Sequence, residues 1–132
     1  RLSRMRRDSL RRCGLSERKA DYLRDLARHF ASGALDPTAW PALDDEALIE
    51  RLTDVNGIGR WTAEMFLIFH ELRTDVFPIG DIGVQKAIAH HYNDGERLAG
   101  EALHAIAAPW RPWRSVATWY LWRSLDPVPV EY

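Results

Sequence analysis

The segment that most restricts the fold is VNGIGRWTAEMFLIF, residues 55–69, in which two glycines precede a tryptophan and a long apolar run. One predicted helix ends at Leu52 and the next begins at Arg60, so only a few residues are left to reverse the chain. Gly57 and Gly59 suit a turn that needs positive φ or a close approach of two backbones. The sequence therefore predicts a tight hairpin between two helices at about residues 52–61.

Helical spacing of apolar residues extends over most of the chain, and no strand alternation or fixed repeat accompanies it. Ser16 is a predicted N-cap, and Gly33 a predicted helix end. The helix between them should carry Ala20, Leu23, Ala27 and Phe30 on one apolar face. We expect helices over residues 3–13, 16–33, 44–52, 60–72, 81–91, 96–108 and 114–125. The predicted fold class is all-α.

Composition excludes several kinds of protein. Apolar residues make up 46% of the 132, which is enough to bury a core. A single cysteine excludes an internal disulfide framework and a four-cysteine zinc or iron–sulfur site, and the histidines lack metal-ligand spacing. No apolar stretch reaches membrane-spanning length, so we expect a soluble intracellular protein with no membrane partner.

The formal net charge of −1 argues against a protein that coats nucleic acid by bulk electrostatics, but it leaves local phosphate binding open. Six arginines crowd the first twelve residues, and this cluster fits a solvated helix face as well as a phosphate-facing one. At the hairpin, the N–H groups of Gly59 and the following residues would point outward from a helix N-terminus, which is an anion-binding arrangement. A bare G-x-G fits a simple packing turn better, so the hairpin alone does not decide its function.

Four motifs together identify a family resemblance. LTDVNGIGRWTAEMFLIF resembles the hairpin of the helix-hairpin-helix (HhH-GPD) DNA glycosylase superfamily, and the resemblance is strongest to its alkylated-base branch, 3-methyladenine DNA glycosylase II. GLSERKADYLRDLA, DVFPIGDIGVQKAI and WRPWRSVATWYLWR match in the family's order and spacing, from about Gly14 to Arg123. The resemblance implies a helical bundle in which the hairpin is followed by the catalytic-aspartate loop and helix. It also implies one domain over residues 1–132 that lacks the family's N-terminal helices, so we expect the chain alone to be weakly active or inactive.

The resemblance places the catalytic carboxylate at Asp81. Breaking an N-glycosidic bond builds positive charge on the sugar, which a carboxylate can stabilise while it orients or deprotonates water. An alkylated purine is already cationic and leaves readily, so one carboxylate suffices. Asp81 also stands where an aspartate caps a helix, and the two roles can coexist.

Trp61 occupies the position at which strand-cutting relatives carry a lysine. Without that amine no Schiff base with the sugar can form, so we expect a monofunctional glycosylase. A tryptophan face also attracts a cationic base. The resemblance assigns Trp61, Met65 and Trp122 to the base pocket, whereas the other tryptophans are expected to serve packing.

The implied DNA-backbone contacts are Asn56, Gly57, Ile58, Gly59, Arg60 and Thr62. The carbonyls of Thr53, Val55 and Gly57 are candidate ligands for a structural Na⁺ or K⁺, and no cofactor is otherwise required. Outside the hairpin, we expect Asp75 to fix the shape of its loop and Arg114 to pair with a carboxylate or a carbonyl.

The expected function is base excision repair by hydrolysis of the N-glycosidic bond of alkylated purines such as 3-methyladenine. The partner would be double-stranded DNA containing alkylated bases, in the cytoplasm of a bacterium or the nucleus of a eukaryote. Two alternatives stay open. One is a non-catalytic helix-hairpin-helix module that only holds DNA, and the other is a glycosylase for another damaged base.

Overall fold

The computed structural model describes residues 2–126, and the chain divides into two compact units, residues 1–63 and 64–132. The described part consists of α-helices and short 3-10 helices and contains no strand, which confirms the all-α prediction. The prediction that residues 1–132 form one domain stays a prediction. No helix of residues 2–126 is long and apolar enough to cross a membrane.

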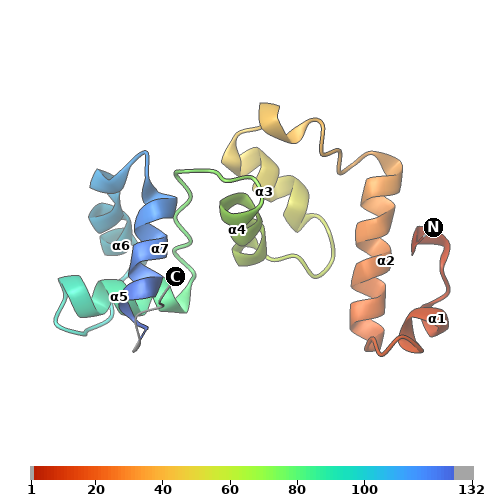
Figure 1. The fold of residues 1–132 in the computed structure, drawn as a ribbon, viewed down its shortest axis with the longest axis horizontal. Helices are drawn as coiled ribbons and strands as arrows, with labels where there is room; N and C mark the ends of the chain where they lie inside the picture. Colours follow the sequence, from red (N-terminus) through yellow and green to blue (C-terminus); the bar gives the residue numbers. More distant parts are fainter. Residues whose placement is uncertain (1, 127–132) are drawn as a thin grey trace, which may run out of the picture. The chain divides into compact units, whose positions relative to one another are not determined.

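The first unit is built around one long helix, α2 (Figure 1). Its α-helices are α1 (Arg7–Arg11), α2 (Glu17–Ser32), α3 (Asp45–Thr53) and the start of α4 (Arg60–Phe69), with 3-10 turns η1 (Leu2–Arg4) and η2 (Trp40–Ala42). The Ser16 hydroxyl caps α2 by accepting the N–H of Lys19 at 3.3 Å, and Gly33 ends the helix at φ +79°. Both boundaries agree with the sequence prediction.

The N-terminal segment does not form the one continuous helix that was predicted over residues 3–13. The backbone of Arg6 is extended, and it separates η1 from α1. Arginines at positions 4, 7 and 11 would repel one another at helical spacing, which disfavours a single helix. Instead, Arg7 pairs with Asp21 of α2 at 2.8 Å and Arg11 with Glu17 at 3.3 Å.

The apolar face of α2 is only partly as predicted. Ala20 is fully buried, but Phe30 is 44% exposed, and its ring packs edge-on against Trp40. Trp40 is buried, as the packing prediction for it required. The unit's remaining buried apolar side chains include Leu35, Leu48, Ile49, Leu52 and Val55.

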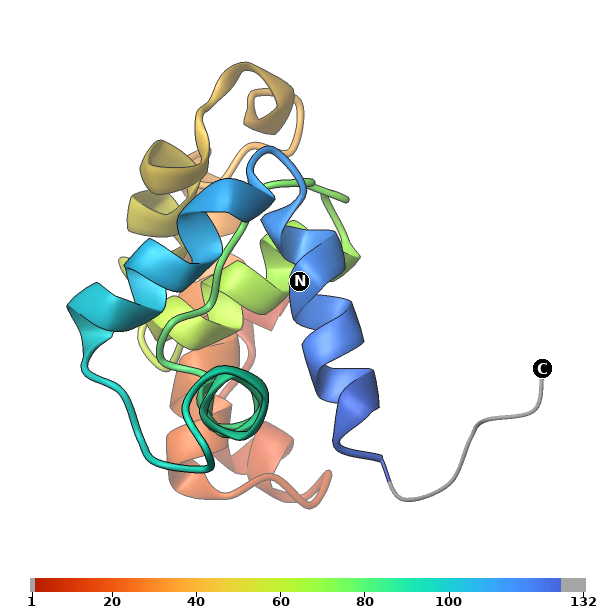
Figure 2. The same ribbon diagram turned by 90° about the vertical axis from the view of Figure 1, so that its left-hand side faces the viewer.

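In the second unit, α5 (Ile82–Tyr92) packs against α7 (Arg114–Ser124), as both views show (Figures 1 and 2). Between them come α6 (Gly100–Ala107) and the 3-10 turn η3 (Ala108–Trp110). The core contains Phe77, Val84, Ala87, Ile88, Leu103, Ala107 and Leu121, and Trp110 and Trp122 pack against it. Trp113 and Trp119 lie at the surface.

Two helix boundaries in this unit differ from the prediction, because both helices are shorter than expected. The helix expected to reach residue 72 ends at Phe69, and Leu72 adopts a left-handed conformation with φ 55°. The helix expected from residue 96 begins at Gly100; Asp94 and Gly95 are left-handed, and Ala99, directly before the helix, is extended.

Candidate functional site

The hairpin loop, residues 54–59, joins the end of α3 to the start of α4. The N–H of Ile58 donates to the Val55 carbonyl at 3.1 Å and closes the turn. Gly57 has φ +92°, and a Cβ at this position would come closer than 3.0 Å to the ring of Tyr22 on α2. The left-handed backbone and the close approach both require glycine, as the sequence predicted.

Gly59 has neither feature that was expected of it. Its φ is ordinary, and within its unit no described heavy atom lies within 4 Å of the place where a Cβ would stand. Its carbonyl accepts the N–H of Ala63 at 3.0 Å, so Gly59 begins the hydrogen-bond ladder of α4. The missing side chain therefore leaves open space at the N-terminus of a ten-residue helix.

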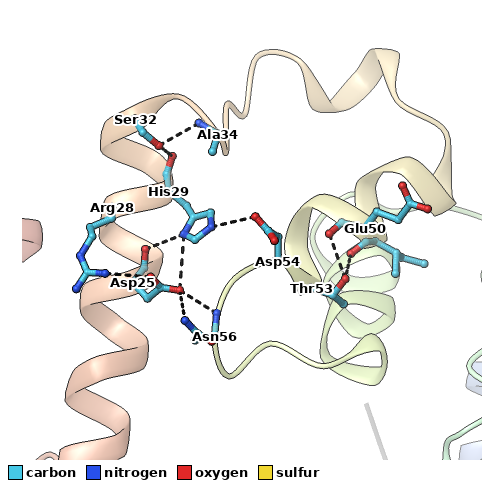
Figure 3. A network of polar contacts seen from close by, with 10 residues as sticks. Asp25, Arg28, His29, Ser32, Ala34, Glu50, Thr53, Asp54 and Asn56 are labelled. Carbon is cyan, nitrogen blue, oxygen red and sulfur yellow. Dashed lines mark hydrogen bonds and ion pairs between the residues drawn. The ribbon is translucent and has the colours of Figure 1, made fainter.

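Asn56 faces α2. Its main-chain N–H and its side-chain Nδ2 both donate to Oδ2 of Asp25, each at 2.9 Å (Figure 3). These two bonds hold the pKa of Asp25 below its ordinary value of 3.8, and the charges of His29 and Arg28 lower it further. Asn56, expected at the DNA backbone, uses its amide groups to fasten the loop to α2.

Arg60 also has a partner within the first unit. Its guanidinium forms a two-armed bond with the carboxylate of Glu46 at the start of α3, and the Nη1–Oε2 arm measures 2.9 Å. This pairing lowers the pKa of Glu46. Of the other predicted backbone contacts, Ile58 is half-buried and Thr62 is exposed.

Asp81 caps α5 in the second unit. Its Oδ1 accepts the N–H of Val84 and the indole Nε1–H of Trp122, both at 2.8 Å. A Cβ at Gly83 would stand 3.0 Å from that oxygen and 3.1 Å from Trp122 Cδ1, so the bare glycine keeps room for the contact. The capping role predicted for Asp81 is confirmed, and the indole fixes the orientation of the carboxylate.

The loop that leads to Asp81 is pinned from α7. Arg114 Nε and Nη2 bond the two carboxylate oxygens of Asp75 at 2.7 and 2.9 Å, and Nη2 also donates to the Asp75 carbonyl. The Ser115 hydroxyl donates to the Arg73 carbonyl at 2.6 Å and accepts the N–H of Val76 at 2.9 Å. Arg114 therefore finds the carboxylate predicted for it, lowers the pKa of Asp75 and fixes the loop before the catalytic candidate.

Phe69 is an aromatic residue that the sequence reasoning missed. Its ring stacks on the indole of Trp122 with centroids 5.9 Å apart and planes 15° apart, although the residue is 61% exposed. The available signal was spacing, since Trp61, Met65 and Phe69 follow one another at intervals of four in α4. Phe69 thus adds an exposed ring beside the Asp81–Trp122 pair.

The predicted site residues are divided between the two units. The hairpin and Trp61 belong to the first, and Met65, Asp81 and Trp122 to the second. The predicted sharing of one base pocket by Trp61 and Trp122 stays a prediction.

A metal held by side chains has no support in residues 2–126, because no group of three His, Cys, Asp or Glu side chains there is arranged to hold one. The candidate cation ligands of the hairpin are main-chain carbonyls, a donor type that suits Na⁺ or K⁺. The Val55 carbonyl accepts one hydrogen bond, from Ile58, and keeps a second lone pair. A Na⁺ or K⁺ held by the carbonyls of Thr53, Val55 and Gly57 stays a prediction.

Comparison with known proteins gives consistent matches. Residues 1–112 match the HhH-GPD superfamily base excision DNA repair protein family. DNA-3-methyladenine glycosylase 1 of Schizosaccharomyces pombe is 38% identical over 117 residues, which cover 87% of this chain and 51% of that protein. The chain spans 41% to 51% of the length of three such curated relatives.

Two solved structures share the fold at high similarity. The crystal structure of a DNA-3-methyladenine glycosidase from Bacillus halodurans superposes with a TM-score of 0.86 at 38% identity, covering 96% of this chain and 58% of that one. The S. pombe 3-methyladenine DNA glycosylase in complex with abasic DNA gives 0.79 at 35% identity, covering 93% and 60%.

Proposed function

The chain belongs to the HhH-GPD superfamily of base excision DNA repair proteins, and from this premise we propose that it hydrolyses the N-glycosidic bond of alkylated purines in double-stranded DNA. The relatives named above are 3-methyladenine glycosylases, which supports this lesion class. The observation that carries the proposal is the carboxylate of Asp81, held at the start of α5 by a cap bond and by an indole N–H.

The geometry suits an electrostatic role for Asp81. Two donors bond the same oxygen, Oδ1, and so fix the plane of the carboxylate, which a group that must face a developing sugar cation requires. The same carboxylate can orient or deprotonate the attacking water. Because an alkylated purine leaves as a neutral base, no second carboxylate is needed as a general acid.

Trp61 supports hydrolysis without strand cutting. It follows Arg60 at the position where a lyase would need an amine, and an indole cannot form a Schiff base. The exposed ring of Trp61 is suited to contact a flipped, cationic base.

The hairpin would hold the DNA backbone through main-chain groups. A helix N-terminus offers N–H donors and a positive dipole end to a phosphate, so a chain of net charge −1 can bind DNA without a basic surface. The open space at Gly59 would admit the phosphate. A Na⁺ or K⁺ on the carbonyls of Thr53, Val55 and Gly57 would add positive charge there. The protein would act where genomic DNA lies, in the bacterial cytoplasm or the eukaryotic nucleus.

The test is to incubate excess protein with duplexes that each carry one lesion: an alkylated purine, a deaminated base or an oxidised base. Released base is measured by mass spectrometry, and strand breaks are measured with and without alkali. We expect release of the alkylated purine, breaks only after alkali, and no adduct trapped by borohydride. Binding without release of any base would instead favour a non-catalytic DNA-holding module, and preferential release of another lesion would refute the assigned substrate class.

A further inference from the structure

One face of α2 contacts three residues of the hairpin loop in register. Tyr22, Asp25 and His29 are spaced by three and four residues, so their side chains emerge on the same side of the helix. In that order they meet Gly57, Asn56 and Asp54. The loop therefore runs antiparallel to α2 and contacts it about once per helical turn.

We infer that this face of α2 is a positioning element for DNA binding, with Asp25 as its central residue, and the inference rests on the proposed role of the hairpin. Oδ2 of Asp25 takes both the main-chain N–H and the side-chain amide of Asn56 (Figure 3). A single oxygen thus fixes the backbone and the rotamer of the residue that precedes Gly57. Arg28 bonds the other oxygen, Oδ1, at 3.3 Å and holds the carboxylate in place.

His29 adds the second attachment. Its Nδ1 lies 2.9 Å from the main-chain carbonyl of Asp25, and its Nε2 lies 3.4 Å from Oδ2 of Asp54. Tyr22 completes the set, because its ring leaves no room for any side chain at Gly57. The loop is thus fixed at three points before the chain reaches Gly59 and the start of α4.

Pre-organisation is what these contacts would contribute to DNA binding. A loop that adopts the phosphate-binding shape only part of the time binds with an affinity reduced by that fraction. Asp25 itself need not touch DNA; it acts through Asn56. Removing a carboxylate ordinarily strengthens binding to a polyanion. Removing the carboxylate of Asp25 should instead weaken DNA binding, because the loop loses its attachment.

A charge-matched pair of variants on α2 separates the two effects. Asp25→Asn weakens the attachment of the loop, whereas Asp21→Asn removes the same charge from a carboxylate that bonds Arg7 and not the hairpin. The probe is a short duplex with a tetrahydrofuran abasic site, titrated at fixed salt. Thermal unfolding and hydrogen exchange of the hairpin peptide are measured in parallel.

We expect Asp25→Asn to weaken DNA binding about tenfold and to speed exchange in residues 54–59. Asp21→Asn should bind within about twofold of the unsubstituted chain, or more tightly. Asn56→Ala removes one of the two bonds and keeps Asp25, so its DNA affinity should lie between those of Asp25→Asn and Asp21→Asn. This variant tests the inference even if Asp25→Asn proves poorly folded.

Equal affinities in both Asp variants, or a loss in Asp25→Asn that follows global unfolding rather than hairpin exchange, would overturn the inference. Tight binding by the unsubstituted chain with unchanged affinity in Asn56→Ala would overturn it as well and leave the proposed function intact. Absence of binding by the unsubstituted chain would overturn the proposed function and this inference together.

Discussion

Replacing Gly57 by alanine should destabilise the protein, while the same change at Gly59 should not. At φ +92° an L-residue pays about 1–2 kcal/mol of backbone strain. The added Cβ would also overlap the Tyr22 ring, and overpacking of this kind costs about 1–3 kcal/mol. We therefore expect the free energy of unfolding of Gly57→Ala to fall by about 2–5 kcal/mol.

The two contributions can be separated by urea denaturation in two backgrounds. In Tyr22→Ala the ring is gone, so the further cost of Gly57→Ala should shrink to the strain alone, about 1–2 kcal/mol. Gly59→Ala is the matched control: its φ is ordinary and its surroundings are open, so it should gain up to about 1 kcal/mol from a less flexible unfolded chain. It should nevertheless weaken DNA binding, because the new methyl group occupies the space proposed for a phosphate. Equal losses of stability at both glycines, or a Gly57→Ala cost that does not depend on Tyr22, would refute this reasoning.

Three further predictions follow from the described contacts. Arg114→Ala should lower the free energy of unfolding by about 2 kcal/mol, because Asp75 loses charge-assisted bonds. Since the folded pKa of Asp75 is lowered, the part of this loss that depends on the carboxylate charge should be full above pH 3.8 and disappear as the pH falls through the folded pKa, whereas the part from the bond to the Asp75 carbonyl should remain. Trp122→Phe keeps a ring against the core but removes the donor to Asp81, so it should slow base release about tenfold with little change in DNA affinity. His29 faces the Asp25 carbonyl and the Asp54 carboxylate, and these acceptors raise its pKa above 6.5. Protection of the hairpin amides against hydrogen exchange should therefore be greatest below pH 6.5 and decline as the pH rises through the folded pKa of His29. His29→Gln should abolish this pH dependence, and His90→Gln should not.

Local signals in the sequence predicted the helices and their caps. Ser16, Gly33 and Asp81 mark helix boundaries through their own chemistry, so a single position suffices to place each of them. The N-terminal helix and the fourth and sixth helices were predicted too long. The fourth helix, for example, ends shortly before the left-handed Leu72, a residue that no propensity singles out for a turn.

Long-range partners could not be predicted in the same way. Asp25 and Asn56 are thirty-one positions apart, and nothing in the sequence around Asp25 distinguishes it from Asp21 on the same helix. The bond from Trp122 to Asp81 spans forty-one positions and depends on the packing of α7 against α5. Phe69 was missed although it follows Trp61 and Met65 at helical spacing, because its significance depends on the indole that stacks against it.

Single-turnover base release by Asp81→Asn tests the central claim most directly. Asparagine caps a helix as well as aspartate does and keeps an oxygen for the Val84 N–H and the Trp122 indole, so folding and DNA affinity should be retained. If Asp81 is the catalytic carboxylate, release of an alkylated purine should fall at least about a hundredfold, while binding to an abasic-site duplex should stay within about twofold. Excision at the rate of the unsubstituted protein would contradict it.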